Sequence, residues 1–299
     1  MKHVVIDSIS KSFTKGDAPA LDNISFEVEA GELFGLIGPD GAGKTTLFRI
    51  LTTLLLADSG NATVNGHDVV KAYKQIRKEV GYMPGRFSLY QDLSVEENLS
   101  FFATIFNTSI EENYELVRDI YVQIEPFKKR KAGKLSGGMK QKLALCCALI
   151  HKPTVLFLDE PTTGVDAVSR KEFWEMLKGL KKQGITILVS TPYMDEASLC
   201  EKIALIQEGK ILSINTPENI VGEYPEPLYA IKSANMSGLL KALRNSDLVK
   251  SANAFGEYHH ITLENGDAAV EPLLSCLDMD AMEVKPIKPT IEDCFINLM

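Results

Sequence analysis

Residues 38–46 read Gly-Pro-Asp-Gly-Ala-Gly-Lys-Thr-Thr, and they decide the fold of this chain. The apolar run Leu33–Ile37 precedes them, and a helical pattern follows from Gly43. A G-x-x-x-x-G-K-[ST] sequence between a strand and a helix is typical of a loop that binds phosphate groups. Its glycines let backbone N–H groups converge on phosphate oxygens at the positive end of the helix. We therefore expect nucleotide binding by Gly38, Asp40, Gly41, Ala42, Gly43, Lys44, Thr45 and Thr46.

Two side chains of this phosphate loop (residues 38–46) have expected chemical roles. We expect the Lys44 ammonium to reach the β- and γ-phosphates, and the Thr45 hydroxyl to bind Mg²⁺. The alternative is a glycine turn in front of an ordinary helix. The strand before the loop and the helix after it favour the nucleotide site.

A second apolar run, Val155–Leu158, ends in the acidic pair Asp159 and Glu160. An uninterrupted apolar run is typical of a buried parallel strand, whose carboxyl end lies at the ligand-binding edge of an α/β sheet. We expect Asp159 to hold Mg²⁺ and Glu160 to act as the general base on the attacking water. A solvated acidic turn is the alternative, and the phosphate loop elsewhere in the chain argues against it.

A third segment, residues 135–141, reads Leu-Ser-Gly-Gly-Met-Lys-Gln and opens another helix. The Ser136 hydroxyl and the free N–H groups of the first helical turn form a second potential anion site. By itself this segment does not differ from an ordinary glycine-containing helix start.

Together, the phosphate loop, the 135–141 segment and residues 156–166 (Leu-Phe-Leu-Asp-Glu-Pro-Thr-Thr-Gly-Val-Asp) resemble the ATP-binding subunits of ABC transporters. The resemblance covers about residues 1–220. It implies that two such domains pair head to tail, with ATP between the phosphate loop of one and the signature segment of the other. The residues that it adds to the ATP site are Ser136, Gly137, Gly138, Gln141 and Asp166.

The resemblance also assigns Phe13 to an aromatic position that stacks on adenine. A core phenylalanine is the alternative for that residue.

The order of patterns predicts an α/β fold in two domains. Strands alternate with helices, so residues 1–224 are expected to form a mostly parallel sheet. The resemblance implies a P-loop NTPase core of the ABC type, with an antiparallel β subdomain and a helical subdomain at about 93–150. Residues 224–227 read Tyr-Pro-Glu-Pro and are typical of a linker. Residues 225–299 then show a β-α-β-β-α-β order, which predicts a small, ferredoxin-like α+β domain for dimerisation or regulation. A purely stabilising appendix is the alternative.

Two positions depart from the family pattern. Residues 81–85 read Gly-Tyr-Met-Pro-Gly, whereas the family has glutamine at the last of these positions. Pro192 stands where the family has a histidine that contacts the γ-phosphate, and proline has no side-chain donor. We expect Pro192 to be the first residue of the following helix. Because Gly85 and Pro192 remove two contacts, we expect slow hydrolysis or a partner subunit that supplies an intact second site.

Composition limits the partners and the cellular location that we expect for the chain. Its net charge of −8 and pI near 5.3 argue against nucleic acid as a partner. No apolar run approaches the roughly 20 residues that span a bilayer, so we expect a cytoplasmic protein. The resemblance places it on the inner face of the cell membrane through a separate permease. Adjacent Cys146 and Cys147 lie in an apolar helical run and are expected in the core.

The sequence also bears on the direction of transport and on the docking surface. Residues 289–295 resemble a C-terminal element of subunits that serve exporters. A groove near Phe87–Phe102, with Phe87, Leu89 and Tyr90, is expected to receive a short helix of the permease. The alternative is that these three side chains belong to the core. The competing interpretations are a soluble ABC ATPase acting on ribosomes or DNA, and a nucleotide-binding regulator without useful turnover.

Overall fold

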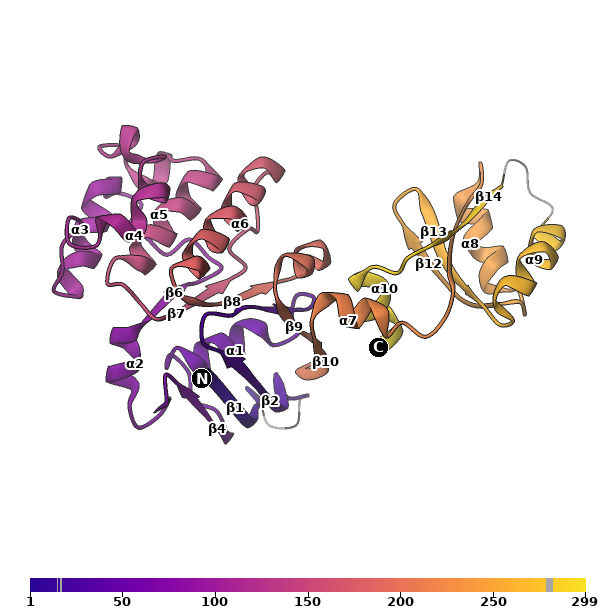
Figure 1. Ribbon diagram of the computed structural model, residues 1–299, viewed down its shortest axis with the longest axis horizontal. Coiled ribbons are helices and arrows are strands. Elements are labelled where there is room, and N and C mark those ends of the chain that lie inside the picture. Colours follow the sequence, from indigo (N-terminus) through magenta and orange to yellow (C-terminus); the bar gives the residue numbers. More distant parts are fainter. Residues whose placement is uncertain (15, 17, 278–281) are drawn as a thin grey trace. The chain divides into compact units, whose positions relative to one another are not determined.

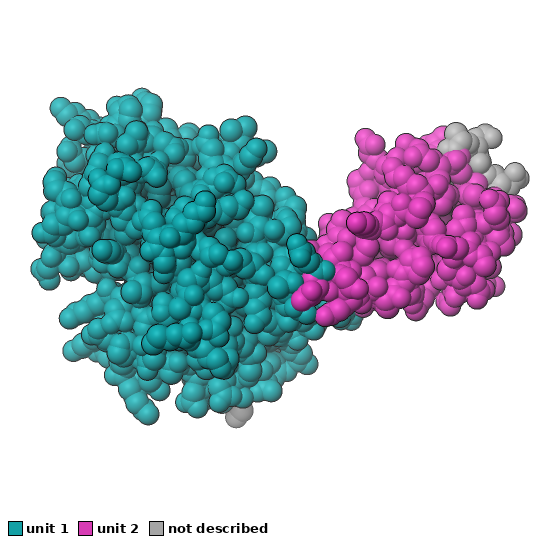
Figure 2. All heavy atoms as spheres, in the orientation of Figure 1, with its two compact units in different colours: residues 1–218, 298–299 teal, residues 219–297 magenta. Residues whose placement is uncertain are grey.

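The computed structural model describes residues 1–14, 16, 18–277 and 282–299 (Figure 1). The chain divides into two compact units: Met1–Glu218 with Leu298–Met299, and Asn219–Asn297 (Figure 2). This division lies earlier in the chain than the linker expected at residues 224–227. No helix in the described ranges is long and apolar enough to cross a membrane.

The first unit is built on a six-stranded sheet in the order β10-β9-β3-β8-β7-β6. Neighbouring strands from β9 to β6 are parallel, and β10 is antiparallel to β9. Every residue of β3, β7 and β8 is buried, which explains the apolar run within each of these strands. The sheet confirms the mostly parallel α/β core. Its strands are β3 (Leu33–Ile37), β6 (Val80–Met83), β7 (Val155–Asp159), β8 (Thr186–Thr191), β9 (Lys202–Gln207) and β10 (Lys210–Asn215).

A second, antiparallel sheet of the same unit has the order β2-β1-β4-β5. The turn between β4 and β5 consists of Asn65 and Gly66, with φ of 52° and 75°. These left-handed values match the two-residue hairpin that Asn-Gly predicts. The strands are β1 (Lys2–Lys11), β2 (Leu21–Glu29), β4 (Ser59–Val64) and β5 (His67–Asp68).

Helices cover the six-stranded sheet. Figure 1 shows α3, α4 and α5 grouped on one side of β6–β8 and α1 on the other. Helix α1 contributes Phe48, whose ring packs edge-on against Phe157 of β7 with centroids 5.6 Å apart. Helix α3 begins with a capping box, in which the side chains of Ser94 and Glu97 each accept from the other's backbone N–H. The helices are α1 (Lys44–Leu51), α2 (Tyr73–Glu79), α3 (Val95–Ile105), α4 (Tyr114–Tyr121), α5 (Gly137–Leu149) and α6 (Ala167–Lys182).

The expectation that Pro192 begins a helix is wrong. The segment after β8 is a 3₁₀ helix, Met194–Leu199, with Tyr193 at its N-cap. The Tyr193 N–H donates to the Thr191 hydroxyl over 3.1 Å. This bond closes a short turn around Pro192, so the helix starts only after the turn.

The second unit contains a four-stranded antiparallel sheet in the order β12-β13-β11-β14. One face packs against α8 and α9 through an apolar core that includes Ile231, Leu239 and Ile261. This strand order is that of the split β-α-β arrangement. The elements are α7 (Pro217–Gly222), β11 (Leu228–Lys232), α8 (Met236–Arg244), β12 (Val249–Phe255), β13 (Tyr258–Leu263), α9 (Val270–Leu277), β14 (Glu283–Ile287) and α10 (Ile291–Leu298).

Candidate nucleotide site

The carboxyl ends of the parallel strands bring four sequence segments to one edge of the sheet. In the strand register, Ile37 pairs with Thr191 and Asp159 pairs with Ser190. The Gly38 N–H donates to the Thr191 carbonyl over 3.2 Å, which ties the phosphate loop to the end of β8. The phosphate loop, the Asp159–Glu160 pair and the segments after β6 and β8 therefore border a single site.

The phosphate loop runs so close to its neighbours that two of its glycines have no room for a side chain. A Cβ at Gly43 would lie 2.4 Å from the Ala20 carbonyl oxygen, and φ there is 105°. A Cβ at Gly38 would lie 2.1 Å from the Ile206 carbonyl oxygen. The loop leads directly into α1, whose first N–H groups have no intrahelical partner. This arrangement provides a backbone cradle for phosphate oxygens.

The Lys44 side chain lies within this cradle and is only 3% exposed. Its ammonium donates to the carbonyl oxygens of Gly38 (2.8 Å) and Pro39 (2.9 Å). The same nitrogen lies 3.2 Å from a Glu160 carboxylate oxygen. Two hydrogen bonds and one ion pair therefore compensate the buried charge, which joins the phosphate loop to the expected general base.

The backbone of Glu160 adopts a conformation that is uncommon for a residue with a side chain, with φ of 49°. Its N–H donates to both the carbonyl oxygen (3.0 Å) and the hydroxyl (3.1 Å) of Ser190. The Ser190 hydroxyl in turn donates to the buried Asp159 carboxylate over 2.6 Å. Ser190 therefore fixes both acidic residues. The sequence analysis missed Ser190, although a polar residue near the end of the apolar strand β8 was a usable signal.

Both departures from the family pattern lie at this edge. A Cβ at Gly85 would lie 3.1 Å from the Asp159 carbonyl oxygen and 3.7 Å from the Glu160 Cβ. Position 85 thus borders the two carboxylates without offering a side chain to the site. Pro192 directly follows Thr191, the residue bonded to Gly38.

The signature segment, residues 135–141, lies elsewhere on the same unit. Ser136 caps α5 by accepting from the Met139 N–H over 3.3 Å, and Ser136 and Gly137 are exposed. A Cβ at Gly138 would lie 2.7 Å from the Ser169 hydroxyl, so α5 begins close against α6. Figure 1 shows α5 and α1 on different sides of β6–β8. The structure therefore does not bring Ser136, Gly137 and Gly138 to the phosphate loop of the same chain. Gln141 lies partly buried farther along α5.

Asp166 has a clear structural contribution at the start of α6. Its carboxylate accepts from the N–H groups of Val168 (3.1 Å) and Ser169 (3.0 Å) and from the Ser169 hydroxyl. The bonds from Ser169 hold the pKa of Asp166 below its usual value. The carboxylate is exposed, so it both caps the helix and faces outward.

Phe13 is 67% exposed, so the core alternative for this residue is wrong. The Lys11 ammonium lies 5.9 Å from the centre of its ring. By contrast, Cys146 and Cys147 are buried as expected, and burial raises the pKa of both thiols.

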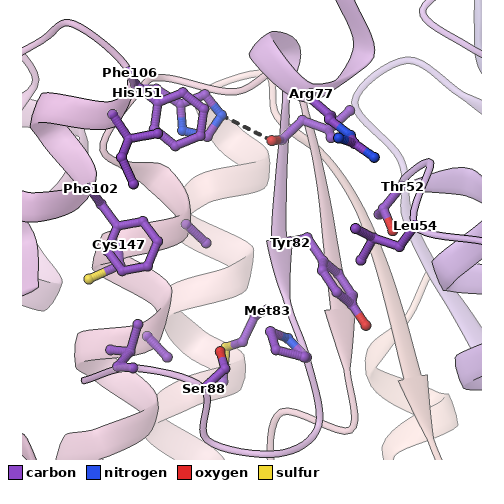
Figure 3. Close-up of a pocket in the computed structure, with 16 residues that line it drawn as sticks. Thr52, Leu54, Arg77, Tyr82, Met83, Ser88, Phe102, Phe106, Cys147 and His151 are labelled. Carbon is purple, nitrogen blue, oxygen red and sulfur yellow. Dashed lines mark hydrogen bonds between the residues drawn. The ribbon is translucent and has the colours of Figure 1, made fainter. Parts of the chain in front are cut away.

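An apolar groove of about 400 Å³ lies between β6, α3 and α5 (Figure 3). Leu89 and Phe102 line it as expected, whereas Phe87 and Tyr90 do not. In its wall, the His151 ring stacks on Phe106 with centroids 3.8 Å apart. The His151 Nε2–H donates to the Val80 carbonyl over 3.0 Å, and burial lowers the pKa of this imidazole. The lowered pKa favours the neutral form of this imidazole, while Arg77 adds a charged side chain to the same lining.

Comparisons with known proteins agree with this geometry. A family profile described as "ABC transporter" matches residues 21–163. The probable multidrug ABC transporter ATP-binding protein YbhF of Escherichia coli (strain K12) is 37% identical over 301 residues, covering 99% of this chain and 52% of YbhF. The chain thus spans about half the length of that relative. The Nod factor export ATP-binding protein I of Burkholderia lata is 39% identical over 217 residues, covering 72% of this chain and 71% of the relative.

A solved structure shares the architecture of about three quarters of this chain. The cbiO1 protein of Clostridium perfringens, part of the ABC transporter complex cbiONQ, aligns with a TM-score of 0.66 at 26% identity. The alignment covers 74% of this chain and 91% of cbiO1. With the phosphate loop, the Asp159–Glu160 pair and these relatives in agreement, the chain belongs to the ABC transporter family.

Proposed function

We propose that this chain hydrolyses Mg-ATP between two paired cassettes and thereby drives a separate membrane permease that exports its substrate. The observation that carries the proposal is the contact of Lys44 with Glu160 beside the buried Asp159, all at the mouth of the phosphate loop. Such a site combines a cation for phosphate oxygens with a carboxylate for the attacking water.

The donor set at this site fits Mg²⁺. Asp159 offers a carboxylate whose second oxygen has no protein donor among the described residues, and Thr45 offers a hydroxyl at the first turn of α1. The described residues contain no cluster of three His, Cys, Asp or Glu side chains suited to a metal. Mg²⁺ ordinarily binds one or two protein oxygens together with nucleotide phosphates and water. Bound there, it would neutralise charge on the phosphates, while Lys44 and Glu160 act from the protein.

The separation of the two anion sites in one chain supports pairing with a second cassette. The exposed start of α5, with Ser136 and Gly137, offers N–H groups that a nucleotide in the same chain does not use. A head-to-tail partner would place this helix start, and the exposed Asp166, against its ATP. The partner is a second copy or a related cassette. We assign the second unit, residues 219–297, to dimer contacts or regulation.

The apolar groove is the surface that fits the permease. It measures about 400 Å³, and the exposed Ile105 lies on its border with Leu89 and Phe102 in its wall. A short amphipathic helix from a membrane protein would bury its apolar face there. This contact would hold the cassette on the inner face of the membrane. The names of the relatives, a multidrug transporter and an export protein, support export as the direction.

Replacing Ile105 with glutamate should abolish recovery of the chain with membranes and leave ATP turnover within about twofold of wild type. A charge on the rim must be desolvated when an apolar helix docks, which costs on the order of 1–3 kcal/mol or more. The measurement is pull-down of a tagged chain from solubilised membranes, with mass spectrometry for the permease. Val122→Glu is the matched control, because Val122 is 49% exposed, like Ile105 at 55%, and lies outside the groove. Equal recovery of both variants with a permease would exclude the groove as the docking site.

Slow hydrolysis is expected because Gly85 and Pro192 provide no side-chain contact to the γ-phosphate or the attacking water. The double variant Gly85→Gln, Pro192→His should therefore raise kcat about 10-fold or more over wild type, since one positioned donor is commonly worth about 100-fold. The gain is set below that figure because a Cβ at position 85 lies only 3.1 Å from the Asp159 carbonyl oxygen. Steady-state phosphate release measures it. A purified wild-type homodimer that turns over at ordinary transporter rates would contradict this expectation.

The same two positions favour a second candidate, a nucleotide-binding regulator with no useful turnover. It shares the ATP site and differs only in whether Glu160 performs chemistry. The comparison of wild type with the Glu160→Gln variant, given in the Discussion, separates the two.

A further inference from the structure

A buried carboxylate behind the site, Glu196, connects three segments that border it. Glu196 is 2% exposed and lies in the 3₁₀ helix after β8. One of its oxygens accepts from the Thr162 hydroxyl (2.8 Å) and from the Arg170 guanidinium (3.1 Å). The other accepts from the Thr191 hydroxyl (2.6 Å). Thr162 follows the Asp159–Glu160 pair, Thr191 ends β8, and Arg170 belongs to α6.

This carboxylate is well compensated despite its burial. All its partners are donors, as an ionised carboxylate requires, and one of them is a cation. The Arg170 guanidinium is itself held by three contacts: Glu196, the exposed Asp195, and the face of the Tyr193 ring at 4.4 Å. If one side chain of this cluster were removed, its buried partners would be left unpaired. We therefore expect the three segments that Glu196 connects to shift together or not at all.

The cluster encloses the turn that contains Pro192. Thr191 donates to Glu196 and accepts from the Tyr193 N–H, while the Tyr193 carbonyl accepts from the Glu196 N–H over 3.2 Å. Proline fixes φ within this turn. The path from β8 to the 3₁₀ helix is therefore set by protein contacts on both sides of Pro192.

We propose that Glu196 is a positioning residue: with Thr162, Thr191 and Arg170 it forms a brace that holds the loop after Glu160 and the turn at Pro192 in their working geometry before nucleotide binds. A side chain at position 192 that contacts the nucleotide would help to order the turn at this position. Pro192 makes no such contact, and the brace orders the turn through protein contacts instead. This inference rests on the proposed function, because it concerns turnover at Glu160. It also predicts that the brace orders the loop at residues 160–166, and this order can be measured without turnover.

The experiment uses the full chain and compares Glu196→Gln with Asp195→Asn. Both residues contact Arg170, but the Asp195 side chain is 75% exposed and, among the described residues, its carboxylate accepts no hydrogen bond from Thr162 or Thr191. We expect Glu196→Gln to lower kcat about 10-fold or more, since a shift of about 1 Å near the chemistry can cost 100-fold. The KM for ATP should stay within about twofold. Without nucleotide, amide hydrogen exchange over residues 160–166 should become faster in Glu196→Gln and stay unchanged in Asp195→Asn.

A second pair of variants tests the brace even if the Glu196→Gln protein does not fold. Thr162→Val deletes the hydroxyl that Glu196 accepts from, and Thr162→Ser retains it. We expect Thr162→Val to reproduce the kcat loss and the faster exchange, and Thr162→Ser to restore both. Unchanged exchange over 160–166 in Thr162→Val overturns the brace, as does an equal effect of Asp195→Asn and Glu196→Gln. If wild type shows no turnover, the proposed function fails, and the exchange data still decide the brace.

Discussion

Replacing Glu160 with glutamine should lower kcat for ATP hydrolysis about 100-fold or more, while ATP binding is retained. An amide cannot take the proton of the attacking water, and a positioned general base contributes about 10²–10⁴-fold. The geometry should survive, because Ser190 holds the residue through its backbone N–H. The amide oxygen can also still accept from Lys44, which lies 3.2 Å from the carboxylate. Single-turnover phosphate release, with a fluorescent nucleotide to measure affinity, provides the test.

Glu208→Gln is the matched control for this variant. Glu208 has φ of 48°, close to the 49° of Glu160, and it is an exposed residue in the turn between β9 and β10. Its replacement should leave kcat unchanged. Turnover of Glu160→Gln equal to wild type would remove Glu160 from the chemistry. If neither protein exceeds the buffer background, the regulator without turnover becomes the better account.

The second large effect concerns affinity. Lys44→Met should weaken ATP binding by about 100-fold. Methionine matches the length of the lysine stem but lacks the ammonium, and a hydrogen bond to a charged group is worth about 1.5–3 kcal/mol. Losing about 2.7 kcal/mol corresponds to two powers of ten in Kd. Isothermal titration with Mg-ATP measures the change directly.

Two further measurements make the Lys44 result interpretable. Lys210→Met removes an exposed lysine whose partner is Asp22, and it should bind ATP as wild type does. A thermal unfolding scan shows whether the first unit still folds, because Lys44 is buried and bonded to the Gly38 and Pro39 carbonyls. Wild-type affinity in a folded Lys44→Met protein would contradict the assignment of the phosphate loop.

The sequence predicted those features that depend on neighbours along the chain. The apolar runs Leu33–Ile37 and Val155–Leu158 form the buried strands β3 and β7, and the helix expected after the phosphate loop is α1. Each is governed by local backbone chemistry or by burial on both faces of a strand. The site residues from the phosphate loop and from Asp159 and Glu160 could likewise be named, because their spacing places them at the ends of strands.

The expectations that the structure contradicts concern features that depend on neighbours in space. Pro192 has the φ of a first helical residue, yet a bond from Tyr193 to Thr191 delays the helix. Of the side chains expected in the groove, Phe87 and Tyr90 do not line it. None of these outcomes follows from spacing, because each depends on which segments become neighbours in space.

The residues of the candidate site show which features the sequence determined and which only the tertiary structure decided. By itself, the sequence determined that the chain has a phosphate loop, a carboxylate pair and a glycine-opened signature helix in the order of an ATP-binding cassette. Only the tertiary structure showed that Ser190 bonds both Asp159 and Glu160, and that Glu196 gathers Thr162, Thr191 and Arg170. The physical reason is that phosphate binding uses consecutive backbone groups, which a motif records. The hydrogen bonds that position the carboxylates instead cross between strands and helices, and only strand register and packing bring those side chains within reach.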